Sequence, residues 1–110
     1  KGKSGDTFGP IGPYLVTQDE ILDINNLNLI LEVNGKKMQS GNTKNMIFDT
    51  NFIVSYLSKF MSLQPGYVIT TGTPPGVGMG MKPQQFLKAG DTIRLSIDNL
   101  GEQNSKVVEL

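Results

Sequence analysis

The sequence contains no cysteine, no histidine and no tryptophan. Without cysteine, these residues cannot build a disulfide framework, a thiolate nucleophile or a zinc-thiolate cluster, and the composition fits a reducing cytoplasm better than secretion. Without histidine, they cannot build a Ser-His-Asp triad, a Cys-His pair or a histidine metal site. The side chains that remain for chemistry are lysines, carboxylates and hydroxyls.

Neither sign of charge dominates, and no long hydrophobic run occurs. Ten lysines and arginines balance ten acidic residues, so we expect no nucleic-acid partner. No segment approaches the roughly 18 apolar residues that cross a bilayer, so we expect no membrane partner. The absence of cysteine favours a cytoplasmic location. The first residues, KGKSGDTF, include neither an initiator Met nor an apolar signal region. We therefore expect an upstream part to be absent.

Hydrophobic periodicity predicts a small set of strands and one main helix. Alternating leucines at 27–31, followed by Asn34-Gly35, predict a hairpin with a type I′ turn and a returning strand at 36–39. Alternation at 93–97 predicts another strand. Side-chain oxygens at 49–51 and the apolar spacing that follows predict a helix over about 51–62.

Three further strands are expected from shorter patterns, at Tyr14 to Thr17, at Tyr67 to Thr71, and at Val107-Val108. Many short strands with one helix, and no βαβ repeat, indicate an α+β class that is mostly β.

Two loops rich in glycine and proline are the candidate site. GKSGDTFGPIGP and TTGTPPGVG lie on either side of the hairpin and the helix, and rigidly held loops often carry function. If they converge, Lys3 supplies a cation and Thr73 a hydroxyl beside Gly72, where the backbone can approach a ligand closely. That combination suits a small carboxylate or a 2-oxo acid. A phosphate-binding loop is not expected, because no Gly-Lys-Ser/Thr follows the second loop.

Each of these residues also has a simpler interpretation. From composition alone, Lys3 is more readily a solvated lysine. The polar residues after it, 4–7, commonly satisfy the backbone of a turn. Thr73 before Pro74 can be an ordinary residue where a strand ends. The cluster at 46–48 suits core packing or a subunit contact better than a cofactor site.

Four motifs, in order along the chain, resemble the fumarylacetoacetate hydrolase family. They are KGKSGDTFGPIGPYLVTQDEI, LEVNGKKMQSGNTKNMIF, YLSKFMSLQPGYVITTGTPPGVGMGMKP and LKAGDTIRLSIDNLGEQ. Within the family, these motifs are most similar to those of bacterial enzymes of the 2,4-diketo-3-deoxy-L-fuconate hydrolase and 2-hydroxyhepta-2,4-diene-1,7-dioate isomerase type. The resemblance implies that residues 1–110 are the C-terminal part of a single catalytic domain with a mixed, mostly β fold.

The resemblance also implies a site. Lys3 matches the family's catalytic lysine, and Thr73 with Gly72 matches its substrate-binding segment. A divalent cation, Mg²⁺ (or Mn²⁺ or Ca²⁺), is implied, but its ligands, two Glu and one Asp, lie upstream of the GKS motif and outside this chain. A cation on a 2-oxo acid stabilises an enolate. Tyr67 stands where the family usually has Asp, and we expect only a local structural effect.

The expected function is a metal-dependent hydrolase or lyase that cleaves a C–C bond of a 2,4-dioxo acid, in the catabolism of sugar acids or aromatic compounds. Its partners would be a small 2-oxo acid and a second copy, with dimer contacts near Met46 to Phe48. An isomerase or decarboxylase that shares the enolate remains an alternative. A further alternative is an inert fragment, because the chain alone lacks the metal ligands and is expected to be inactive.

Overall fold

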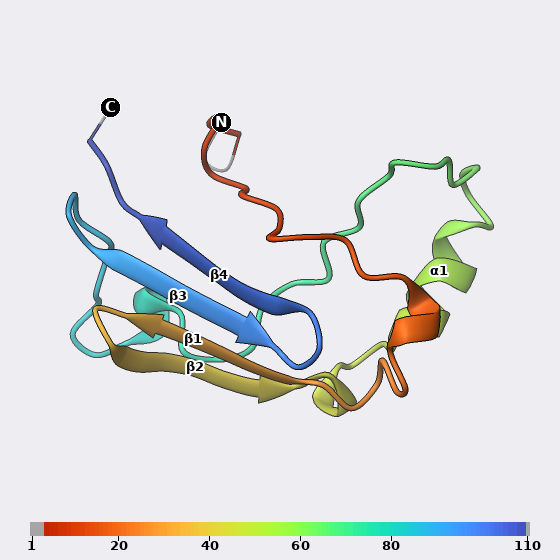
Figure 1. Cartoon of the computed structure of the whole chain (residues 1–110), viewed down its shortest axis with the longest axis horizontal. Helices are drawn as coiled ribbons and strands as arrows, with labels where there is room; N and C mark the ends of the chain where they lie inside the picture. The colour runs from red at the N-terminus through yellow and green to blue at the C-terminus, as the bar shows by residue number, and fades with distance from the viewer. Residues whose placement is uncertain (1–3, 110) are drawn as a thin grey trace.

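The part of the chain that the structure describes forms a four-stranded sheet with one α-helix beyond its end. In the computed structural model, which describes residues 4–109, β1 (Asn28–Val33), β2 (Lys36–Asn42), β3 (Thr92–Ile97) and β4 (Gly101–Lys106) form a sheet in the order β2-β1-β3-β4 (Figure 1). The predicted α+β, mostly β class is confirmed. All strand pairs here are antiparallel, so the mixed sheet that the resemblance implies does not arise within these four strands.

The hairpin of β1 and β2 turns where its sequence predicts. Asn34 has φ 51° and Gly35 has φ 75°, the positive values that a type I′ turn requires. The Asn34 side chain also ties this turn to β3. Its Nδ2 donates to Asp91 Oδ1 at 2.8 Å, and its Oδ1 accepts from the Thr92 backbone N–H at 2.9 Å.

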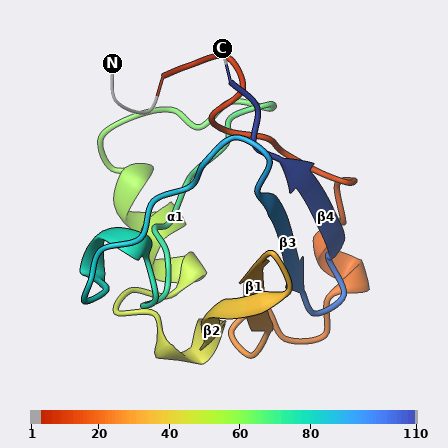
Figure 2. The ribbon, with the colours of Figure 1, turned by 90° about the vertical axis from the view of Figure 1, so that its left-hand side faces the viewer.

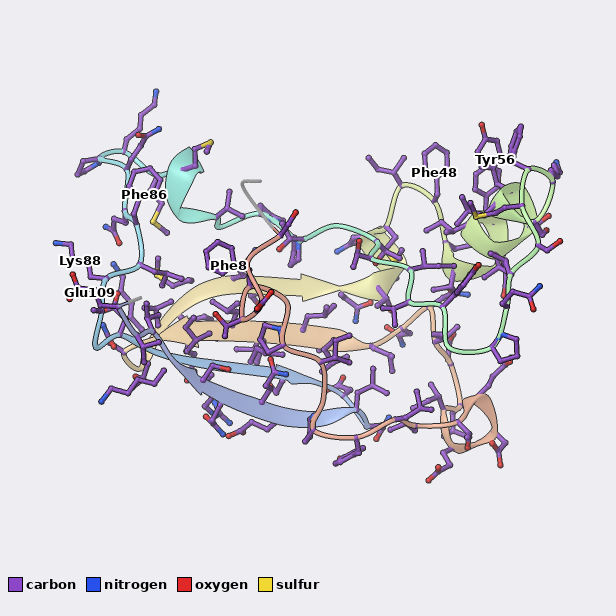
Figure 3. The ribbon with its side chains drawn as sticks, turned by 90° about the horizontal axis from the view of Figure 1, so that it is seen from above. Phe8, Phe48, Tyr56, Phe86, Lys88 and Glu109 are labelled. Carbon is purple, nitrogen blue, oxygen red and sulfur yellow. The ribbon has the colours of Figure 1, made fainter. Side chains whose placement is uncertain are left out.

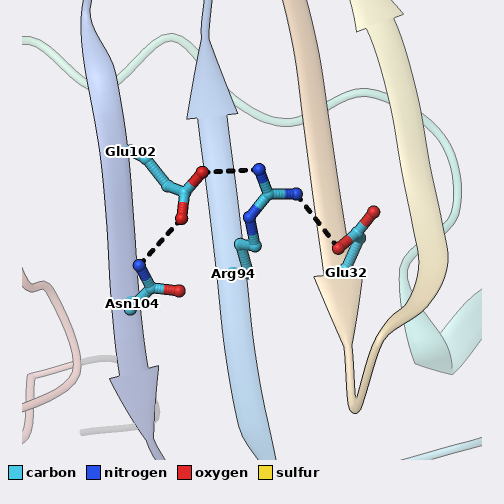
Figure 4. A network of polar contacts seen from close by, with 4 residues as sticks. All are labelled: Glu32, Arg94, Glu102 and Asn104. Atoms are coloured by element: carbon cyan, nitrogen blue, oxygen red, sulfur yellow. Dashed lines mark hydrogen bonds and ion pairs between the residues drawn. The ribbon is translucent and has the colours of Figure 1, made fainter.

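The sheet has one apolar face and one polar face. Strand register places six aliphatic side chains on the same face: Leu29, Leu31, Val33, Ile93, Leu95 and Ile97. The opposite face carries Arg94, which bonds Glu32 at 3.2 Å and Glu102 at 2.5 Å across three strands (Figure 4). Because charged and aliphatic positions alternate along β3, the apolar face is the one suited to hydrophobic packing.

Helix α1 (Thr50–Leu57) begins at its predicted cap and is shorter than predicted. The Asp49 carboxylate accepts a hydrogen bond of 2.7 Å from the Phe52 N–H, which satisfies a free amide of the first turn. Regular helix ends at Leu57, and turns replace the predicted continuation to about residue 62. There the Ser58 hydroxyl bonds the Ser55 carbonyl at 2.9 Å. Such local bonds compete with helix geometry.

Three predicted strands are corrected by the structure. Residues 14–17 have no regular structure and lead into a 3-10 turn at Gln18–Glu20. Residues 67–71 also have no regular structure, because they pair with no strand of the part described here. The last strand is the polar segment Gly101–Lys106 rather than Val107-Val108. Its pairing with β3 outweighs the low β-propensity of its residues.

Few side chains of the described residues are buried. Within residues 4–109, Leu27 is the buried hydrophobic side chain, at 4% exposure, and Gln39 is the buried polar one, at 9%. The segment after α1 passes through a 3-10 turn at Gly78–Gly80 and then arches across to β3 (Figure 2). No helix in this part of the chain has the length and apolar character to cross a bilayer.

Candidate functional site

The TGTPPGVG loop lies against the edge strand β2, where glycines permit close approach. A Cβ on Gly41 would come within 2.9 Å of the Pro74 Cβ. A Cβ on Gly76, which has φ +112°, would overlap the Met38 carbonyl oxygen. Both positions are therefore restricted to glycine by contact between the loop and the strand. The loop is seated on the sheet rather than free in solvent.

Thr73 is held in place by a residue that sequence analysis missed. Gln39 Nε2 donates to the Thr73 Oγ1 at 2.8 Å and to the Pro74 carbonyl oxygen at 2.5 Å. Thr73 itself is exposed, and the adjacent Gly72 has φ +93° with nothing within 4 Å of a Cβ position. The predicted pair of Gly72 and Thr73 is thus exposed, and Gln39 holds the Thr73 hydroxyl and the backbone carbonyl of the next residue, Pro74.

The N-terminal loop is attached to the same face of the sheet. Gln103 Nε2, on β4, donates to the Gly12 carbonyl oxygen at 3.3 Å. A Cβ on Gly101 would meet the Tyr14 hydroxyl at 2.5 Å, so this segment also lies close to the strand. Earlier in the loop, the Phe8 N–H bonds the Gly5 carbonyl at 3.0 Å and closes a turn.

One row of paired residues across the four strands, the glutamine row, makes the contacts with both loops. Gln39 pairs with Leu31, Leu31 with Leu95, and Leu95 with Gln103, and directly paired residues of a sheet point to the same face. This glutamine row therefore fastens the TGTPP loop at the β2 edge and the GPIGP loop at the β4 edge. Three strand spacings of about 4.8 Å separate its ends by about 14 Å. The predicted cation, Lys3, lies outside the described residues.

The main charged cluster lies on the opposite face. Hydrogen bonds from Arg94 and Asn104 hold the pKa of Glu102 below its ordinary value, and Glu102 and Glu32 raise the pKa of Arg94. Each charge has a partner, so we interpret the cluster as a sheet-stabilising network. No group of three Asp or Glu side chains within residues 4–109 is arranged to hold a metal ion. The described residues do not fit the implied divalent cation.

A cavity of about 720 Å³ lies on the apolar face, beside the loop but away from Thr73. Leu31, Val33, Met38, Val77 and Phe86 are among its lining side chains. Gln39 also lines it, whereas Thr73 does not. The cavity is therefore a neighbour of the candidate site and not the site itself.

A second exposed feature is a row of stacked rings along α1. The aromatic ridge consists of Phe48, Phe52, Tyr56 and Phe60, whose successive ring centroids lie 4.8, 5.9 and 5.0 Å apart. Figure 3 shows Phe48 and Tyr56 together at the helix, at the opposite end of the molecule from Phe86 and Lys88. All four rings are about half exposed or more.

Comparison with known proteins identifies the family. The family model described as fumarylacetoacetate (FAA) hydrolase C-terminal matches residues 1–108. A Burkholderia ambifaria protein whose name assigns it to the hydrolases is 64% identical over 104 residues, which cover 94% of this chain and 37% of that protein. The chain therefore spans well under half the length of this relative.

Two solved structures extend the comparison. Maleylpyruvate hydrolase from Sphingobium sp. SYK-6, in complex with manganese(II) ion and pyruvate, has a TM-score of 0.85 and 40% identity, covering 94% of this chain and 36% of its own. A 2-hydroxyhepta-2,4-diene-1,7-dioate isomerase from Mycobacterium marinum has a TM-score of 0.80 and 38% identity. The match covers 94% of this chain and 37% of the isomerase chain. With these matches, the chain belongs to the fumarylacetoacetate hydrolase family, whose members include hydrolases and isomerases.

Proposed function

We propose that the complete protein, meaning this chain with the additional length that its relatives carry, is a metal-dependent hydrolase or lyase acting on a 2,4-dioxo acid. The observation that carries the proposal is Thr73, an exposed residue beside Gly72 whose hydroxyl is bonded by Gln39, in the same cross-strand row as the Gln103 that bonds the N-terminal loop. The pyruvate in the Sphingobium structure is itself a 2-oxo acid and supports this substrate class.

In this proposal the chain supplies recognition and charge stabilisation. Thr73 donates its O–H to the substrate carboxylate, a charge-assisted bond that is stronger than a neutral one. Lys3, assigned from its motif alone, places an ammonium group at the oxygen on which negative charge develops. The divalent cation, which the manganese of the Sphingobium structure supports, would have to be held by residues beyond 4–109.

The reaction proposed is hydrolytic cleavage between the two carbonyl groups. Water adds to the 4-oxo carbon, and the bond between that carbon and C3 breaks. Its electron pair passes to C3 and is delocalised onto the 2-oxo oxygen, where an ammonium group stabilises the enolate. Protonation at C3 then yields a 2-oxo acid beside the released carboxylic acid.

An isomerase is the second candidate, and the name of the Mycobacterium marinum structure favours it. Isomerisation would use the same carboxylate contact and the same enolate but would break no C–C bond. Product analysis on an unsaturated 2-hydroxy diacid and on an acylpyruvate separates the two. Formation of a shorter 2-oxo acid supports hydrolysis, and a product of unchanged mass supports isomerisation.

Substitutions at Lys3 and Thr73 test the proposal in the complete protein. Lys3→Ala should lower kcat on acetylpyruvate, a simple 2,4-dioxo acid, by about a hundredfold or more. Thr73→Val should raise KM about tenfold, whereas Thr73→Ser, which keeps the hydroxyl, should change it little. Lys59→Ala is the matched charge control. Unchanged turnover in Lys3→Ala, with the fold intact by circular dichroism, would refute the assigned role.

We also propose that the complete protein is a homodimer that contacts its second copy through residues 46–48 and the aromatic ridge. The ridge is exposed in this chain, and aromatic side chains are enriched in the cores of protein interfaces.

A further inference from the structure

The side-chain amide of Gln39 has only one chemically consistent orientation. Its nitrogen lies 2.8 Å from the Thr73 Oγ1 and 2.5 Å from the Pro74 carbonyl oxygen. A carbonyl oxygen can only accept a hydrogen bond, so the NH₂ group and not the amide oxygen must face Pro74. One N–H then points to each oxygen, and the Thr73 hydroxyl receives a donor.

That donor determines what the Thr73 hydroxyl can offer to a ligand. A hydroxyl has one O–H and two lone pairs, and Gln39 occupies a lone pair. Within residues 4–109, no protein atom accepts the Thr73 proton. Because Thr73 is exposed, its proton is available to an acceptor in the bound ligand.

Gln39 reaches the loop because of a β-bulge. In the ladder between β1 and β2, Glu32 pairs with Lys37. The next residue of β1, Leu31, pairs with Gln39, which leaves Met38 as an extra residue. Since side chains alternate between faces, one extra residue moves Gln39 to the apolar face under the loop. In a regular ladder it would point to the opposite face.

Burial holds the contact in place. Gln39 is 9% exposed, so an amide that rotated away from Thr73 and Pro74 would lose partners where little water can replace them. The loop cannot shift further toward the strand, because Gly76 already lies against the Met38 carbonyl.

We infer that Gln39 is a positioning residue that occupies one lone pair of the Thr73 hydroxyl, leaves its O–H to donate to the ligand and so favours a carboxylate at this point. The inference rests on the proposed function, since it takes the ligand of Thr73 to be the carboxylate of a 2-oxo acid. Gln39 acts through Thr73 and makes no contact with the substrate itself.

Gln39→Glu in the complete protein reverses the polarity of this contact. The glutamate would accept the Thr73 O–H and turn the hydroxyl lone pairs toward the ligand, where they repel a carboxylate. KM for acetylpyruvate, and the inhibition constant of pyruvate, should rise about tenfold or more, with kcat changed much less. Gln39→Met, which removes the donors without adding charge, should raise KM by a smaller factor. Gln64→Glu adds the same charge at an exposed position and should leave KM unchanged.

A double-mutant cycle with Thr73→Ala separates this inference from the proposed function. If Gln39 acts through Thr73, Gln39→Glu should add no further increase in KM once the hydroxyl is gone. Independent, multiplicative effects would overturn the inference, as would an unchanged KM in Gln39→Glu and in Gln39→Met. If Thr73→Ala itself leaves KM unaltered, the proposed role of Thr73 fails instead. Circular dichroism and thermal unfolding of each variant show that the fold is retained.

Discussion

Replacing Gly76 by alanine should destabilise the protein more than the same change at Gly66 or Gly80. At φ +112° an L-residue is strained, which costs about 1 to 2 kcal/mol. The new Cβ would also overlap the Met38 carbonyl oxygen. A backbone atom cannot change rotamer to relieve that contact, so overpacking adds to the strain, and we expect a total loss of about 2 to 5 kcal/mol.

Two other glycines are matched controls. Gly66 has φ +90° but nothing within 4 Å of a Cβ, so Gly66→Ala should cost only the backbone strain of about 1 to 2 kcal/mol. At Gly80, a Cβ would make an ordinary contact of 3.8 Å with Val77, so Gly80→Ala should be close to neutral. Urea unfolding of the three variants of the complete protein, followed by circular dichroism, measures the series. If Gly76→Ala costs no more than Gly66→Ala, the loop is not seated on β2 as described.

Three further predictions concern charge, association and metal. The pKa of Glu102 is lowered from 4.5 by Arg94 and then by Asn104, so its contribution to stability is present above that value and is lost as the pH falls through the folded pKa. Thermal unfolding from about pH 6 to pH 2 should therefore show a gap between wild type and Glu102→Gln that closes on acidification, and a constant gap would contradict this. Phe52→Ser and Tyr56→Ser should shift the complete protein from dimer to monomer in sedimentation at micromolar concentration; a wild-type monomer would contradict the proposed contact. Calorimetric titration of these 110 residues with Mg²⁺ should show no tight stoichiometric binding, and binding of that kind would contradict the assignment of the ligands to other residues.

Local chemistry accounts for the elements that sequence analysis predicted correctly. The Asn34-Gly35 turn and the Asp49 cap each depend on contacts within a few residues, and both occur as predicted. By contrast, Tyr67 to Thr71 has the composition of a strand, but extended backbone becomes a strand only when another strand pairs with it. The described residues offer that segment no partner.

Sequence analysis indicated the two loops of the candidate site but not the contacts that hold them on the sheet. The glycine and proline pattern indicated the loop containing Thr73, which is an exposed residue, and its binding role stays a prediction. Gln39 resembled an ordinary polar residue of an edge strand, because the bulge at Met38 that turns it inward depends on pairing with β1. The one available signal was Gly41, whose lack of a side chain admits Pro74. The placement of Lys3 remains a prediction.

A crystal structure of the complete protein with pyruvate and a divalent cation tests the central claim most directly. The account predicts a pyruvate carboxylate oxygen within about 3 Å of the Thr73 Oγ1, with the Gln39 amide still bonded to the same hydroxyl and the Lys3 ammonium at the same ligand. Pyruvate bound away from Thr73, or Lys3 and Thr73 in separate regions of the surface, would contradict it.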